Sequence, residues 1–474
     1  MVSLERFGSP PHRIHFRLRF LGVFLMPFAV TAGCSMDELF GTGQGADAAV
    51  ATPSGVQSGE VVVVFTLTHE TRTDADITAN FSTDGGATFV AATEAVGGGG
   101  TENLSVSADG VTHTFIWDSG KDAADGREDV VFRIAPRSGT SALTGSFVLH
   151  NRVFLAASHA ATTGEVSLYE LNLMDGEVRA QGTVASGGNS PWDVLFDRGV
   201  FYVTHTGSNE VAALELDEVQ KALLPLADSP FSTGGIGSKY LATDGARLFV
   251  ANTGSETISI FDVDTGTGAL ALSPHSGVSV SGCRSLVVRG SRLYTASETR
   301  AEIVIHDIQS DGELLLNGFS PIAALGMDTP RAMAIESGRL YVANSGAPTL
   351  VGFRFLGGGD LLAVSGSPFS FTDAGVEAIH VQGIDRLFLA GGAAASFTAL
   401  TVDALGVASE DVGSPLAAQG PANGVSGAAG VVVIGTSTSM TLESYLIDTA
   451  GALTAATGSP FAANGEVARL AVSD

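Results

Sequence analysis

The chain has 474 residues, with 24 Lys and Arg against 50 Asp and Glu, and its formal net charge is −26. This excess of negative charge repels nucleic acid and anionic lipid headgroups at long range, which excludes a nucleic-acid-binding function. The 60 glycines and the low share of charged residues, 16%, are typical of a β protein that is dense in turns.

Residues 1–33 have the pattern of an export signal. Four arginines precede an apolar run at residues 20–30 that is too short to span a bilayer. Small residues then lead to Cys34, and this arrangement resembles a bacterial lipoprotein signal. The resemblance implies that Cys34 is lipidated and that two acyl chains anchor the protein. Thr31 stands where such signals usually have Leu, so an ordinary secretory signal is the alternative.

Two further segments precede the main domain. Residues 34–58 are rich in Gly, Ala and Ser, which predicts a flexible tether. Alternating apolar segments over residues 59–151 predict a small immunoglobulin- or fibronectin-like β-sandwich. The hairpin at residues 82–89 resembles an Asp box, and we expect Asp84 to bond the backbone of its own turn.

Residues 152–474 contain seven copies of one pattern. Each copy opens with a short apolar strand, and these strands begin at Arg152, Val200, Arg247, Arg292, Arg339, Arg386 and Val431. A second alternating run and a Gly turn follow, and most copies end in a Ser-Pro element. Four short strands in roughly 45 residues is the size of one propeller blade. The fold class is therefore all-β, a seven-bladed β-propeller preceded by the small sandwich.

The end of the chain predicts how the ring closes. Residues 465–474 match the segment that precedes the opening strand in the other copies. The first copy lacks this segment because a different domain precedes it. We therefore expect the C-terminal strand to complete the first blade, since an unpaired inner strand would leave open edges.

The repeats resemble a known family. The sequence Leu-Tyr-Val-Ala-Asn is followed by an alternating strand, a Thr-Gly-type turn and Gly-Ser-Pro-Phe. This pattern resembles the lactonase-type seven-bladed propellers with YVTN-like repeats, which include a class of 6-phosphogluconolactonases and a fungal carboxymuconate lactonizing enzyme. The resemblance covers residues 152–474 and implies the fold, whereas an activity has to be argued from the site.

Propeller geometry brings the first residues of the seven inner strands to one rim of the central channel. Read down the repeats, these residues are Trp192, Lys239, Arg284, Arg331, Glu377, Asn423 and Arg469. The second strands end at the same rim, where Glu298 stands in a column with Thr206, Thr253 and Ser345. The cationic arc of Lys239, Arg284 and Arg331 can bind a small anion or a carboxylated sugar, or can simply offset the two glutamates.

His205 is a further rim candidate. It falls in the column that holds Asn252 and Asn344, whose expected task is to bond the adjoining loop. A loop-bonding role is therefore the alternative for His205.

The resembled family has an active-site Arg and Glu, in a Gly-Pro-Arg-His segment and a Tyr-x-x-Asn-Glu segment one hairpin later. Here Gly-Cys-Arg284-Ser is followed by Tyr-Thr-Ala-Ser-Glu298, so the resemblance implies that Arg284 and Glu298 take these roles. Ser285 replaces the family's neighbouring His, and Lys239 lies in the segment that stands where the catalytic His occurs one blade earlier. Glu377 stands where the muconate enzyme has another Arg.

This pair has two interpretations. An Arg can stabilise the oxyanion of an opening lactone, and a Glu can activate water. The alternative is a structural ion pair at the rim. The other histidines lack partners at metal-ligand spacing, so no metal and no cofactor are expected. Cys283 is the single cysteine after Cys34, and we expect it to be buried rather than nucleophilic.

The sequence favours a non-enzymatic function. The first hypothesis is an exported, lipid-anchored, monomeric ring of the bacterial cell envelope, at the outer membrane, that binds an envelope or extracellular protein or glycan through its rim. Export argues against a phosphorylated cytosolic substrate. The alternative hypothesis is a lactonase-like hydrolase that opens a sugar or carboxylated lactone, with Arg284 as the anion clamp and Glu298 as the base or water-positioning group. A calcium-dependent adhesion site, the third hypothesis, lacks recognisable ligand spacing.

Overall fold

The computed structural model describes residues 45–473, except 55–56, 58–59, 96–97, 124–126, 161–162, 324–325, 337, 374, 383–384, 392–394 and 449–450. The predicted signal at residues 1–33 and the predicted lipidation site Cys34 lie outside the described residues. The described helices are α2 (Ser119–Asp122) and the 3-10 turn η1 (Gly357–Gly359). No helix in this part of the chain is long and apolar enough to cross a membrane.

The N-terminal part of the described chain forms two antiparallel sheets with one shared core. One sheet has the order β1 (Asp47–Val50), β2 (Glu60–Thr68), β7 (Val111–Asp118). The other has the order β10 (Phe147–His150), β8 (Arg127–Pro136), β4 (Ile77–Ser82), β5 (Val90–Ala91), with β9 (Ala142–Leu143) on β8. Two short strands, β3 (Asp74–Ala75) and β6 (Leu104–Ser105), pair separately. Phe65, Trp117 and Phe132 are buried between the sheets, and the immunoglobulin-like assignment stays a prediction.

The predicted tether at residues 34–58 is wrong for Asp47–Val50. These four residues form β1, which pairs with β2 along its whole length. Ala48 and Val50 pack against the apolar core, and alternate residues are exposed. The composition hid this strand because a run of four residues with small side chains carries a weak alternation signal.

Asp84 closes its own turn, as the Asp-box resemblance implied. Its carboxylate accepts hydrogen bonds from the Ser82 hydroxyl at 2.6 Å and from the Thr88 amide and hydroxyl at 2.9 and 2.6 Å. These donors, first that of Ser82, hold the pKa of Asp84 well below its usual value. The motif is therefore a structural turn.

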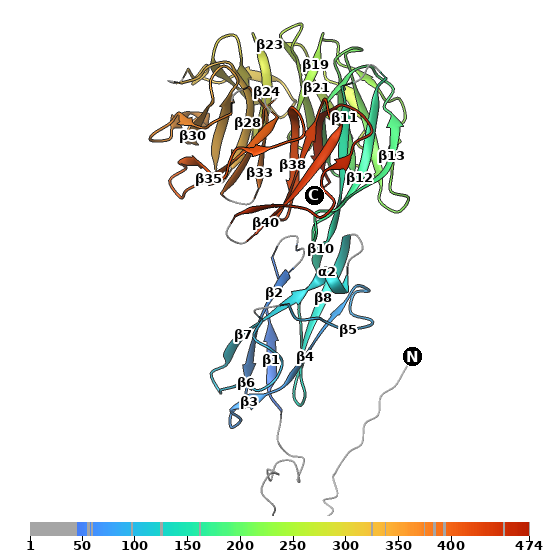
Figure 1. Ribbon diagram of the computed structural model, residues 1–474, viewed down its shortest axis with the longest axis vertical. Coiled ribbons are helices and arrows are strands. Elements are labelled where there is room, and N and C mark those ends of the chain that lie inside the picture. Colours follow the sequence, from blue (N-terminus) through green and yellow to red (C-terminus); the bar gives the residue numbers. More distant parts are fainter. Residues whose placement is uncertain are drawn as a thin grey trace, which may run out of the picture. The chain divides into compact units, whose positions relative to one another are not determined.

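Seven successive antiparallel sheets follow, within the described part of residues 152–472 (Figure 1). From the innermost strand outward, the first four sheets are β43 (Val467–Val472), β11 (Arg152–His159), β12 (Glu165–Asn172), β13 (Val178–Ala185); β14 (Pro191–Asp197), β15 (Val200–His205), β16 (Glu210–Asp217), β17 (Ala222–Pro225); β19 (Ser238–Thr243), β20 (Arg247–Asn252), β21 (Thr257–Val263), β22 (Leu270–Leu272); and β24 (Cys283–Arg289), β25 (Arg292–Ser297), β26 (Glu302–Ile308), β27 (Leu314–Leu316).

The last three sheets continue the same order. They are β28 (Pro330–Glu336), β29 (Arg339–Asn344), β30 (Thr349–Phe355), β31 (Leu361–Ala363); β33 (Val376–Gln382), β34 (Arg386–Gly391), β35 (Ser396–Val402), β36 (Ala408–Glu410); and β38 (Ala422–Ala428), β39 (Val431–Thr436), β40 (Thr441–Ile447), β41 (Leu453–Ala455). Five sheets add a short strand on the third one, namely β18 (Phe231–Ser232), β23 (Val278–Ser279), β32 (Phe369–Ser370), β37 (Leu416–Ala417) and β42 (Phe461–Ala462).

The inner strands make a closed ring. Each inner strand contacts the next one in the order β14, β19, β24, β28, β33, β38, β43. The ring closes because β43 also contacts β14. The C-terminal strand β43 pairs with β11, with Val472 opposite Leu155 and Val467 opposite His159 (Figure 1). The expected completion of the first sheet by the end of the chain is therefore observed.

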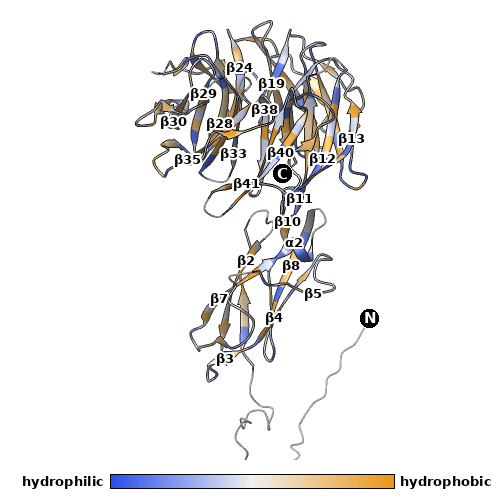
Figure 2. Cartoon of the chain, in the orientation of Figure 1, coloured by the Kyte–Doolittle hydropathy of each residue, from blue (hydrophilic) through white to orange (hydrophobic). Residues whose placement is uncertain are grey.

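Neighbouring sheets bury both faces of the strands between them. All six residues of β15 are buried, and apolar residues recur along the strands of the ring (Figure 2). Tyr202, Tyr294 and Tyr341 are fully buried. Their hydroxyls donate to carbonyls in the turn of the following sheet, at Gly268, Gly359 and Gly406. Strands covered on both faces read as continuous apolar runs, which is why the repeat was visible in the sequence.

Candidate functional site

The inner strands begin around a cavity of about 420 Å³ at one end of the channel. Its lining residues are Trp192, Lys239, Arg284, Arg331, Ser345, Gly375, Glu377, Asn423 and Arg469. All seven starting positions inferred from the repeats are among them. The structure therefore brings together the residues that propeller geometry placed on one rim.

A β-bulge interrupts the start of each inner strand beside the cavity, although in β43 the extra residue is Ala468 and the lining residue is its neighbour Arg469. Ser238 pairs with Asn252 and Tyr240 with Ala251, which leaves Lys239 as the extra residue. The same kind of register shift occurs in all seven sheets, and Arg331 is the extra residue in the fifth. A bulge interrupts the alternation of side chains and redirects one of them. Sequence columns located the residues but gave no sign of the bulges.

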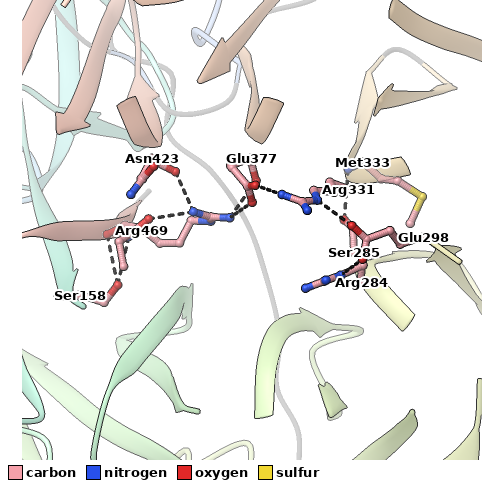
Figure 3. Close-up of polar contacts among 10 residues, drawn as sticks. Ser158, Arg284, Ser285, Glu298, Arg331, Met333, Glu377, Asn423 and Arg469 are labelled. Carbon is pink, nitrogen blue, oxygen red and sulfur yellow. Dashed lines mark hydrogen bonds and ion pairs between the residues drawn. The ribbon is translucent and has the colours of Figure 1, made fainter. Parts of the chain in front are cut away.

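Arginines and glutamates form a continuous chain across the cavity, as Figure 3 shows. The Arg284 Nε donates to Glu298 Oε2 at 2.5 Å, and the Arg331 Nε donates to Glu298 Oε1 at 2.8 Å. Arg331 also donates to the Glu377 carboxylate, whose other oxygen lies 3.8 Å from Arg469 Nη2. The predicted pair of Arg284 and Glu298 is thus one end of a five-residue network that joins four sheets.

This network keeps Glu298 ionised. Burial raises the pKa of Glu298, but hydrogen bonds and charges from Arg331 and Arg284 outweigh burial and hold the pKa below its usual value. A carboxylate with a low pKa is a weak base. It can still accept a hydrogen bond from a water molecule and orient it.

Lys239 contacts an aromatic ring instead of a carboxylate. Its Nζ lies 3.7 Å from the centroid of the Trp192 ring, and Arg469 lies over the same ring at 5.4 Å. Burial, with the positive charges of Arg284 and Arg469, lowers the pKa of Lys239 to about 8. Lys239 therefore changes its charge close to neutral pH.

Asp193, which the sequence did not single out as a site residue, lies next to the rim and connects two inner strands. Its carboxylate accepts hydrogen bonds from the Leu241 amide at 2.9 Å and the Val194 amide at 3.1 Å. Burial raises the pKa of Asp193 to about 6, against the charge of Arg469. Since it ties β14 to β19, its task is to position the bulge that carries Trp192.

The cavity is positively charged. Four cations, Lys239, Arg284, Arg331 and Arg469, stand against Glu298, Glu377 and the neighbouring Asp193, which leaves a net charge of +1 at neutral pH in a chain of −26. A small cationic site in an anionic protein concentrates the field on an anion that enters it. The offsetting of charge by the two glutamates is only partial.

The prediction that His205 is a rim ligand is wrong. Its side chain is fully buried, and Nε2 shares a hydrogen bond of 2.7 Å with the Ser186 hydroxyl. Burial lowers the pKa of His205 to about 4, so the ring is neutral. His205 lies against Gly188 of the adjoining loop, as Asn252 lies against Gly235 one sheet later, where Asn252 also donates to Ser259 at 2.7 Å. The loop-bonding alternative describes this residue.

Two further possibilities were a cysteine nucleophile and a metal site. Cys283 is buried beside the backbone carbonyls of Asn252 and Thr257, each 3.7 Å from the sulfur. Burial raises the pKa of Cys283 to about 11, which leaves too little thiolate for a nucleophile. Among the described residues, no group of three or more His, Cys, Asp or Glu side chains can hold a metal ion.

Comparison with known proteins identifies the ring. No protein-family model and no curated protein matches the sequence. A putative 6-phosphogluconolactonase from Bacteroides fragilis aligns with 68% of this chain and 98% of its own, at 16% identity and a TM-score of 0.60. A periplasmic gluconolactonase from Pseudomonas aeruginosa aligns with 68% of this chain and 99% of its own, at 15% identity and a TM-score of 0.59. The ring has the fold of a lactonase-type β-propeller.

A third structure agrees with this assignment. A putative 6-phosphogluconolactonase from Bacteroides uniformis covers 68% of this chain and 100% of its own, at 14% identity and a TM-score of 0.59. At such low identity the likeness concerns the fold, so the chemistry of this propeller rests on its own residues.

The cavity of the propeller is suited to an oxyanion. Arg284 and Arg331 each direct Nε at Glu298, and their side chains remain 25% and 31% exposed. A guanidinium has five N–H donors in a planar fork, so each arginine keeps donors for a carboxylate or for a developing alkoxide.

Proposed function

We propose that this protein is an exported, lipid-anchored hydrolase that opens an anionic lactone, such as a carboxylated or sugar lactone, in the rim cavity of its propeller. The convergence of four cations and two carboxylates in one cavity of about 420 Å³ carries this proposal. The gluconolactonase and the putative 6-phosphogluconolactonases with the same fold support the choice of a lactone among anions.

The residues divide the reaction between them. Lys239 and Arg469, which share the Trp192 face, hold the carboxylate of the substrate by charge. Glu298 accepts a hydrogen bond from the attacking water and orients it. As the water oxygen bonds to the carbonyl carbon, Arg284 and Arg331 stabilise the oxyanion. The ring C–O bond then breaks, and the alkoxide takes up the proton that the water has lost.

The test is hydrolysis of a panel of carboxylated and neutral lactones by the full chain, followed as acid release. Glu298→Gln and Arg284→Ala are expected to lower kcat/KM by roughly 10²–10³-fold, because each removes an interaction with the transition state. Arg179→Ala is the matched control, since Arg179 pairs with Glu177 at 2.7 Å on the exposed outer strand β13. No turnover above the spontaneous rate by the folded protein contradicts the proposal.

A second candidate is a non-enzymatic propeller that binds an anionic group of an envelope protein or glycan. The observation in its favour is that both rim glutamates already accept hydrogen bonds from arginines, so neither is a free base. Saturable binding of a carboxylated lactone that is never opened, lost in Arg284→Ala, favours this second function.

A further inference from the structure

Successive sheets of the propeller are joined by arginines that insert into the notch between them. Five of the seven second strands begin with an arginine. Arg152 of β11 pairs with Glu170 of its own sheet at 3.1 Å. The other four insert into a notch, and they are Arg247, Arg292, Arg339 and Arg386. Arg247 donates to the Ser310 carbonyl, Arg339 to the Ala404 carbonyl and Arg386 to the Gly451 carbonyl, each at 2.6 Å. In every case the acceptor lies in the turn after the third strand of the following sheet. The Arg292 side chain lies against Gly359 in the equivalent turn.

For three of these four arginines the strand opposite supplies a second partner, whereas Arg339 stands opposite Arg354, another cation. Asp262 faces Arg247 across the strand pair at 3.7 Å, and Asp307 faces Arg292 at 2.9 Å. Thr401 has the same position opposite Arg386, and its hydroxyl accepts a hydrogen bond at 3.0 Å. The notch between two sheets is therefore a guanidinium site that the chain fills with its own side chain.

The second sheet departs from this pattern, because Val200 occupies the arginine's position. A cavity of about 550 Å³ lies there, between the second and third sheets. Its lining residues are Asp197, Arg198, Gly199, Val200, Tyr202, Glu215, Leu216, Leu226, Ala227, Asp228 and residues 263–269. We call this cavity the inter-sheet notch.

The partners of the missing guanidinium are present in the inter-sheet notch. Glu215 is opposite Val200 in the strand pair, the position that Asp262 and Asp307 hold in the next two sheets. Thr265 is the second residue after β21, as Ser310 is after β26, so its carbonyl has the counterpart position in the turn. The tyrosine ring of Tyr202 corresponds to Phe388, over which Arg386 lies at 5.8 Å.

The charge of the inter-sheet notch also suits a cation. Four carboxylates, of Asp197, Glu215, Asp228 and Asp264, line it together with one cation, Arg198, which gives a net charge of −3. Arg198 donates to Asp197 at 3.1 Å, and its charge also acts on the nearby Tyr202 hydroxyl. Arg198 therefore neutralises one carboxylate and leaves the other three.

A valine at this position does not by itself make a cavity. The seventh sheet also opens its second strand with a valine, Val431, but there the following turn at Gly176 packs against Ser444, Leu446 and Ala456. Side chains fill that junction. In the inter-sheet notch Val200 and Tyr202 also pack against a turn glycine, Gly268, but an open volume remains beside the acceptors that hold guanidinium groups elsewhere in the same ring.

We propose that the inter-sheet notch binds a guanidinium cation, supplied as a small guanidine or as an arginine side chain of a peptide. Val200 pairs with Asp197, and His205, at the other end of β15, pairs with Pro191 beside the rim. The inter-sheet notch is thus at the opposite end of the strands from the rim cavity, and its binding does not depend on lactone hydrolysis.

The first test is calorimetric titration of the full chain with ethylguanidinium, with acetyl-arginine methylamide and with an arginine-containing tripeptide. Ethylguanidinium is expected to bind saturably, with a Kd on the order of 1 mM, as is typical of a ligand of few atoms. The citrulline analogue of acetyl-arginine methylamide, which is neutral, is expected to bind at least about tenfold more weakly. Tighter binding of the tripeptide than of ethylguanidinium assigns the site to a partner's arginine, and equal affinity assigns it to a small guanidine.

Variants place the binding at the inter-sheet notch. Val200→Arg puts the chain's own guanidinium there, so ethylguanidinium binding is expected to be lost while the melting temperature is retained or raised. Glu215→Gln is expected to weaken binding about tenfold. Asp262→Asn is the matched control, because the equivalent space in the third sheet is already filled by Arg247.

A variant that opens a second notch completes the test. Arg247→Val removes the guanidinium between the third and fourth sheets and leaves Asp262 and the Ser310 carbonyl, so a second ethylguanidinium site is expected in the folded variant. The proposal is overturned if the folded wild-type chain shows no saturable binding of ethylguanidinium. It is also overturned if Val200→Arg and Glu215→Gln both bind ethylguanidinium as the wild type does.

Discussion

Removal of the C-terminal strand is expected to unfold the whole propeller. The deletion of residues 466–474 takes away β43, which pairs with β11 and contacts both β14 and β38. Val467, Leu470 and Val472 are at most 8% exposed in β43. Burial of one such side chain contributes roughly 1.5–3 kcal/mol, so the three together contribute about 5–9 kcal/mol. A folded domain has a net stability of only about 5–15 kcal/mol, so this loss removes most of it, and the unpaired edge of β11 adds to the cost.

Thermal unfolding followed by circular dichroism measures the effect. The truncated chain is expected to show no cooperative transition at the temperature of the full chain. Leu470→Ala is expected to lower the free energy of unfolding by about 2–5 kcal/mol, whereas Leu405→Ala, at a side chain that is 79% exposed, changes it by less than about 0.5 kcal/mol. An unchanged melting temperature after the deletion would refute the closure of the ring by β43.

Three smaller predictions concern single side chains. Lys239 is protonated below its pKa of about 8, so binding of a carboxylated lactone analogue is expected to be full below pH 8 and to weaken as the pH rises through 8; calorimetry should show that Lys239→Met abolishes this dependence. His205 titrates at about 4 in the folded state against about 6.5 in the unfolded state, so its contribution to stability is lost as the pH falls from about 6.5 to 4, by roughly 2–3 kcal/mol. His205→Asn, the residue at this position in the third and fifth sheets, should keep the loop bond and remove this part of the pH dependence in acid denaturation curves. Tyr341→Phe should cost about 1 kcal/mol in urea denaturation, through loss of the 3.0 Å bond to Gly406.

The seven repeats allowed the propeller fold and the residues of one rim to be predicted from the sequence. Strands buried on both faces give continuous apolar runs, so their register could be counted, and Lys239, Arg284 and Arg331 fell into one column. The last copy was placed one residue off, because Ala468 has the position equivalent to Lys239 and Arg469 follows it. Side-chain direction was harder to infer. His205 ends β15, and Glu298 directly follows the end of the equivalent strand β25, yet His205 is directed into a loop and Glu298 towards Arg284 and Arg331.

Features that depend on neighbouring sheets could not be read from one repeat. The contact of Arg331 with Glu377 joins side chains 46 positions apart, and only the bulges bring them together. The inter-sheet notch likewise follows from the substitution of Val200 for an arginine, which becomes meaningful once the sister arginines are seen to reach the following sheet. The strand β1 was missed because four small residues give little alternation.

The most direct test of the account compares kcat/KM for a carboxylated lactone with that for its uncharged methyl ester. If the rim cations hold the substrate, the full chain opens the acid at least about tenfold faster than the ester, and Arg284→Ala loses this preference along with most of the rate. Equal rates for the two substrates, or no opening of either above the spontaneous rate by the folded protein, would contradict hydrolysis of an anionic lactone in this cavity.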